Sequence, residues 1–86
     1  MELSTAVKKY RSLFDDLKVA GLEDSPLYVL CAERLGDAYS DLGEAQKAAD
    51  SYAMALQVLE KGGFGKPRED LIRRKYQSAR AKVIER

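Results

Sequence analysis

The amino-acid sequence predicts an all-α fold, a single small domain of four antiparallel helices stacked side by side. Apolar residues recur at steps of three and four along most of the 86 residues, the spacing that places side chains on one face of a helix. Glycines and prolines interrupt this spacing, and the pattern occurs twice, at an offset of 41 or 42 residues. The expected helices cover residues 2–20, 26–42, 44–61 and 67–85.

The first helix is amphipathic. Its apolar stripe runs from Leu3 to Leu17, and Gly21 is expected to end it. Ser25 then precedes Pro26, which places a capping hydroxyl directly before a proline suited to a first helical turn. The second helix is therefore expected to begin at Pro26.

The second and third helices form a hairpin around Gly43. A glycine at this point takes the left-handed conformation that other residues adopt only at a cost. Small residues allow the two helix backbones to approach closely, and tyrosines fill the gaps that remain between them. The residues expected to hold this hairpin are Leu35, Gly36, Tyr39, Gly43, Ala48, Tyr52 and Ala55.

The fourth helix follows a glycine-rich loop. Phe64 in this loop is expected to fold back onto the helices, and Pro67 to open the next helix. Glu69 and Asp70 lie in the expected first turn, where the helix dipole favours negative charge. The apolar face of this helix consists of Leu71, Ile72, Tyr76, Ala79 and Val83.

Charge is distributed unevenly along the chain. Residues 1–60 carry six basic and eleven acidic side chains, whereas residues 61–86 carry nine basic and three acidic ones. The total of +1 favours neither a nucleic-acid nor a membrane partner, and no apolar segment reaches membrane-spanning length. The single cysteine, Cys31, and the lack of a cationic, apolar leader favour a reducing intracellular compartment, most simply the cytoplasm.

Catalysis has little support in the sequence. The chain has no histidine, so the commonest general base and the commonest metal ligand are missing. Cys31 falls near the apolar side of the second helix and is expected to be a buried structural thiol. The paired acidic residues point in different directions on their helices, and the segment GGFGK lacks the spacing of a phosphate-binding loop. We therefore expect no enzyme activity, no cofactor and no metal site in these residues.

One stretch of the chain resembles a known repeat. In residues 32–56, Leu35-Gly36 is followed by Tyr39, by a glycine at the turn, and later by Ala48 and Tyr52. This arrangement is similar to one tetratricopeptide repeat, a hairpin of an A helix and a B helix. Ala32 stands where the family often has tryptophan, and Glu60 where it has a closing proline. The repeat step exceeds the usual 34 residues, which resembles the extended repeats of kinesin light chains and related adaptors.

The resemblance implies the helix order B, A, B, A, with one complete repeat between two half-repeats. Such stacks generally need about three repeats and polar end caps, so we expect apolar surface at both ends of this one. The chain is then either a fragment of a longer repeat protein or a unit that two copies complete. Both interpretations are compatible with self-association.

The resemblance also implies a binding groove lined by the A helices, which are the second and fourth helices here. The partner is expected to be a peptide or helix of another protein. An acidic stripe on the second helix has two explanations: it binds a basic partner segment, or Arg74 and Lys82 across the groove neutralise it. The groove residues are expected to be Leu30, Glu33, Asp37, Ser40 and Asp41 on the second helix, and Leu71, Arg74, Ser78, Ala81 and Lys82 on the fourth.

The sequence therefore predicts a protein-interaction scaffold that binds its partner in this groove. The alternative is a homo-oligomerisation module, assembled through open ends of the stack or by helix exchange at the GLEDS or GGFGK segment. Nucleic-acid binding through the basic fourth helix is the least favoured alternative, since a solvated helix face explains the basic run as well.

Overall fold

A computed structural model describes residues 3–23, 25–62 and 66–84 of the chain. The described residues form helices and short turns without a strand, which confirms the all-α prediction. The expected helix ends at residues 2 and 85, and the expected packing of Phe64, lie outside the described residues. The four helices are α1 (Leu3–Val19), α2 (Pro26–Asp41), α3 (Ala45–Gly62) and α4 (Lys66–Ile84).

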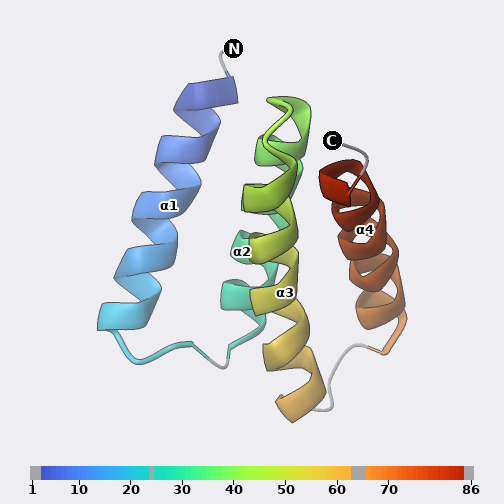
Figure 1. Cartoon of the computed structure of the whole chain (residues 1–86). Helices are drawn as coiled ribbons and strands as arrows, with labels where there is room; N and C mark the ends of the chain where they lie inside the picture. Colours follow the sequence, from blue (N-terminus) through green and yellow to red (C-terminus); the bar gives the residue numbers. More distant parts are fainter. Residues whose placement is uncertain (1–2, 24, 63–65, 85–86) are drawn as a thin grey trace.

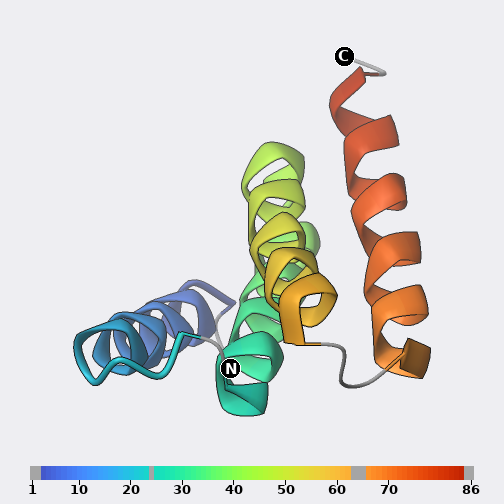
Figure 2. The same ribbon diagram turned by 90° about the horizontal axis from the view of Figure 1, so that it is seen from below.

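The helices alternate in direction and pack mainly against their neighbours in sequence (Figure 1). Both views place α1 and α4 on opposite sides of the hairpin formed by α2 and α3 (Figures 1 and 2). The hairpin therefore forms the centre of the stack. None of the helices in the described part of the chain combines the length and apolar character needed to cross a bilayer.

Two glycines end helices as predicted. Gly21 and Gly43 have φ angles of +75° and +79°, in the region that favours glycine. After Gly43, the Glu44 N–H donates a 2.9 Å hydrogen bond to the Tyr39 carbonyl. After Gly21, the Leu22 N–H donates the equivalent bond to the Leu17 carbonyl. These bonds satisfy carbonyl groups that the helix ends would otherwise leave unpaired.

The start of α2 is also as predicted. The Ser25 hydroxyl accepts a 3.2 Å hydrogen bond from the Tyr28 N–H, and Pro26 occupies the first turn. At the other end, Leu42 caps the helix one residue beyond its last member. The fourth helix begins at Lys66 rather than Pro67, because a proline is tolerated anywhere in a first turn that needs no N–H donor.

The hairpin packs around a glycine and a tyrosine. A Cβ atom placed on Gly36 would lie 2.6 Å from Cε1 of the Tyr52 ring, closer than carbon atoms can approach. Ala48 and Ala55 are completely buried between the helices. The predicted close approach of α2 and α3 is therefore present, and the Tyr52 ring lies directly on the α2 backbone.

The core extends from α1 to α4. The rings of Phe14 and Tyr28 stack with centroids 4.4 Å apart and join α1 to α2, while Ile72 anchors α4. In the described part of the chain, large apolar side chains are exposed on both outer helices, α1 and α4, and also on and beside α2. Among the residues whose side chains are described, the exposed large apolar ones are Leu13, Val19, Leu22, Leu27, Leu30, Leu42 and Leu71.

Candidate partner-binding groove

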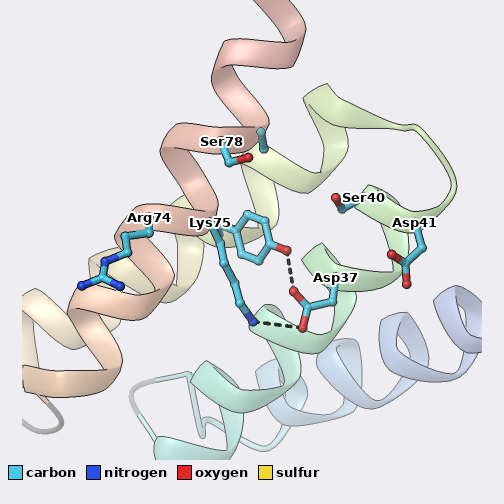
Figure 3. A pocket seen from close by; sticks show the side chains of 8 residues that line it. Asp37, Ser40, Asp41, Arg74, Lys75 and Ser78 are labelled. Atoms are coloured by element: carbon cyan, nitrogen blue, oxygen red, sulfur yellow. Dashed lines mark hydrogen bonds and ion pairs between the residues drawn. The ribbon is translucent and has the colours of Figure 1, made fainter.

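An open groove lies where α2, α3 and α4 meet (Figure 3). Its volume is about 580 Å³, within the range typical of ligand sites, and its walls are mostly polar. Helices α2 and α4 supply the walls, and α3 contributes Tyr52. The lining residues are Asp37, Ser40, Asp41, Tyr52, Arg74, Lys75, Ser78 and Ala79.

The structure brings together five of the ten residues predicted for this groove. Lys82 lies close by, in an adjoining hollow of about 130 Å³ that it shares with Ser40. Leu30, Leu71 and Ala81 are exposed on the same two helices but do not line the groove. The five residues that line it are Asp37, Ser40, Asp41, Arg74 and Ser78.

Glu33 is the exception, because its side chain is only 5% exposed. It lies beneath the surface, between Arg68 and Lys75 of α4. The Arg68 guanidinium donates to Oε1, and the Lys75 ammonium donates to Oε2 at 2.7 Å. A buried carboxylate needs such partners, and both of its oxygens are occupied. The prediction that Glu33 is open to a partner is therefore wrong.

Two of the three carboxylates of the acidic stripe, Glu33 and Asp37 but not Asp41, are neutralised within the chain, and the cations predicted to do so are wrong. Lys75, rather than Arg74 or Lys82, bridges Glu33 and Asp37, with its Nζ 3.2 Å from Asp37 Oδ2. Figure 3 shows why: Lys75 extends toward Asp37, whereas Arg74 extends away from it. Burial alone lowers the pKa of Lys75, but the hydrogen bonds to both carboxylates outweigh it and raise that pKa above its usual value.

The floor of the groove is a tyrosine hydrogen-bonded to a carboxylate. The Tyr52 hydroxyl donates a 2.5 Å hydrogen bond to Asp37 Oδ1 (Figure 3). Burial, followed by this hydrogen bond and the nearby negative charges, raises the pKa of Tyr52 well above its usual 10. Tyr52 therefore remains a neutral donor, and both oxygens of Asp37 are occupied.

Three charged groups in or beside the groove lie outside this network of ion pairs. Within the described residues, Asp41, Arg74 and Lys82 form no ion pair. All three are exposed, and Asp41 and Arg74 lie on opposite walls (Figure 3). The groove thus offers an anion on one side, a cation on the other, and the Ser40 and Ser78 hydroxyls nearby.

Sequence reasoning missed Arg68 and Lys75, although a signal for them exists. One face of the fourth helix carries residues that follow one another at steps of three, four and three, namely Arg68, Leu71, Lys75 and Ser78. The repeat offset of 41 residues aligns Lys75 with Arg34 rather than with a groove residue. Helical spacing from Leu71 would have identified both cations, whereas the repeat alignment did not.

Much of the basic run on α4 is already paired. Arg68 and Lys75 are paired with Glu33. Nη2 of Arg73 lies 2.6 Å from Oε2 of Glu69 and 3.7 Å from Oε1 of Glu60. Arg80 stacks over the Tyr76 ring, with its guanidinium carbon 5.8 Å from the centroid. The positive charge available to a partner is therefore smaller than the sequence suggests.

The described residues contain no cluster of side chains suited to hold a metal ion. Cys31 is buried as predicted, and its thiol donates a 3.2 Å hydrogen bond to the Tyr10 carbonyl. Burial raises the pKa of this thiol, which disfavours the reactive thiolate. The chemistry present in the groove is ion pairing and hydrogen bonding.

Comparison with protein-family models, with curated proteins and with solved structures gave no significant match. The functional argument therefore rests on the geometry of the chain itself.

Proposed function

We propose that this chain is a tetratricopeptide-like interaction module, a scaffold or adaptor that binds a segment of a partner protein in the groove between α2 and α4. The module acts by binding rather than by catalysis. The reducing compartment suggested by its single cysteine would be the cytoplasm.

The hairpin geometry supports the repeat interpretation. Gly36 admits the Tyr52 ring, Gly43 takes a positive φ, and Ala48 is completely buried. These are the roles that the resemblance assigns to small residues at those positions.

The observation that carries the binding proposal is the presence of charged side chains without an ion pair at the groove rim. Asp41 and Arg74 line the opening and form no ion pair among the described residues, whereas the deeper Asp37 is bound by Lys75. A partner segment that presents a basic residue to Asp41 and an acidic residue to Arg74 would complement both walls. The segment expected is therefore of mixed charge, instead of the purely basic one that the acidic stripe alone suggests.

The test is selection of binding peptides from a displayed library, followed by NMR titration of the ¹⁵N-labelled chain with the enriched peptides. Amide signals of the groove residues are expected to shift. Asp41→Lys should weaken binding, because it reverses one rim charge without touching the buried network. Asp16→Lys, an equally exposed reversal on α1 away from the groove, serves as the matched control.

The two charge-reversal variants should differ clearly in their affinity for the enriched peptides. If Asp16→Lys weakens binding as much as Asp41→Lys, net charge rather than the groove is responsible. Enriched peptides that shift no groove signal would overturn the proposal.

Self-association is a second candidate, favoured by the exposed leucines of the first two helices. Leu13 on α1 and Leu27 and Leu30 on α2 are each more than one-third exposed, and an apolar surface of this kind often marks an interface. Light scattering over a dilution series tests this candidate, with Leu27→Glu as the disrupting variant. A monomer at high micromolar concentration would exclude it.

A further inference from the structure

A second cavity lies between α1 and α3, on α2. Its volume is about 340 Å³, and it shares no lining residue with the α2–α4 groove. Side chains of three helices converge on it. These side chains come from α1, α2 and α3.

The floor of this cavity is apolar. Phe14, Leu35 and Tyr39 are all nearly buried in the core, and Met54 is half-buried beside them. Methionine is flexible and adapts to different apolar shapes. The floor therefore suits an apolar group of a ligand.

Two lysines lie over the rings of this floor. The Lys18 ammonium is 5.4 Å from the centroid of Phe14, and the Lys47 ammonium is 5.8 Å from that of Tyr39. Both distances are in the range of cation–π attraction, and both lysines line the cavity. A cation on an apolar floor is positioned to meet an anion attached to an apolar body.

The charges of the lining favour an anion. Arg11 and Lys18 form no ion pair among the described residues. Lys47 does form one, with its Nζ 3.3 Å from Oε2 of Glu44. The two acidic lining residues are Asp15 and Asp50, and Asp50 already accepts a 3.0 Å hydrogen bond from Gln46. Asp15 also forms no ion pair among the described residues, so the three charged lining side chains that remain without an ion pair or a side-chain hydrogen bond, Arg11, Lys18 and Asp15, carry a net charge of +1.

We infer that this cavity is a second binding site, which takes a partner peptide carrying a large apolar residue next to an acidic one. The apolar side chain would lie on Phe14 and Met54, and the carboxylate would pair with Lys18. The volume is near the lower end of the range for ligand pockets, which suits one bulky side chain rather than a whole helix.

The test uses NMR titration of the ¹⁵N-labelled chain with a blocked Gly-Phe-Glu-Gly peptide. Amide signals around the cavity are expected to shift. A Gly-Phe-Gln-Gly peptide, which lacks the charge, should bind about two- to fivefold more weakly, the factor expected for one exposed ion pair. A Gly-Ala-Glu-Gly peptide, which lacks the anchor, should show no saturation.

Two variants of the protein complete the test. Lys18→Gln should abolish the difference between the Glu and Gln peptides, whereas Lys8→Gln, on an exposed part of α1 that does not line the cavity, should preserve it. Thermal melts check that both variants fold. Equal affinity for the two peptides in the unmodified chain, or shifts confined to the α2–α4 groove, would overturn the inference.

Discussion

Glu33 on α2 and Lys75 on α4 are 42 residues apart in the sequence, yet Oε2 of Glu33 lies 2.7 Å from Nζ of Lys75. The pair joins two helices that otherwise interact mainly through α3. The carboxylate is buried, so its partners decide whether it stabilises or destabilises the fold. The same lysine also binds Asp37 and thereby shapes the candidate groove.

Removal of the ammonium should destabilise the chain. We expect Lys75→Met to lower the free energy of unfolding by about 1–3 kcal/mol, because Glu33 and Asp37 each lose a charged hydrogen-bond donor. Urea denaturation followed by circular dichroism measures this. Lys47→Met, which removes an exposed pair with Glu44, is the control and should cost at most about 1 kcal/mol. Equal effects of the two variants would contradict a structural role for Lys75.

A side chain at Gly36 should be damaging even though alanine favours helices. Gly36→Ala would place its Cβ 2.6 Å from the Tyr52 ring, which has to shift within a packed core. We expect a net loss of about 1–3 kcal/mol from overpacking. On an open helix surface the same change would stabilise by about 1 kcal/mol, so the sign of the measured change separates the two situations. Increased stability would show that the hairpin is looser than the structure indicates.

The Tyr52–Asp37 hydrogen bond predicts alkaline sensitivity. The folded state raises the pKa of Tyr52 above its unfolded value of about 10, so the folded chain holds this proton more tightly. Its contribution to stability is fully present below pH 10 and is lost as the pH rises further. We expect the free energy of unfolding to fall more steeply above pH 10 in the unmodified chain than in Tyr52→Phe. Parallel curves for the two proteins would contradict the raised pKa.

The buried thiol predicts slow chemical modification. Cys31 is buried, its pKa is raised by burial, and it is hydrogen-bonded to Tyr10. Its reaction with a disulfide reagent should therefore be limited by transient unfolding and accelerate in denaturant. The control is Ser12→Cys in a Cys31→Ala background, because residue 12 is exposed on α1. Equal rates for the two thiols in buffer would refute the protection.

Local signals in the sequence predicted the helices and their ends well. Gly21, Ser25 and Gly43 act at the positions expected, because caps and positive-φ turns depend on neighbouring residues alone. The close approach at Gly36 was also predictable, since a glycine within a helical pattern indicates a backbone that packs closely. Five of the ten groove residues that the tetratricopeptide resemblance implied line the groove.

Pairing between helices was predicted less well. Arg74 and Lys75 are adjacent in the sequence, and about 100° of helix rotation separates their side chains. The rotation and height of α4 relative to α2 decide which of the two reaches Glu33. These quantities depend on the packing of Ile72 and Ala79 into the core, which no local pattern specifies.

By itself, the sequence determined four helices, their ends and the central hairpin. These features follow from side-chain periodicity and turn chemistry, which act over a few residues. Tertiary structure alone decided that Glu33 is buried, that Lys75 rather than Arg74 neutralises it, and that Asp41 and Arg74 remain at the rim. The physical reason is that charge compensation depends on distances of a few ångströms between helices, and those distances are set by packing of the whole core.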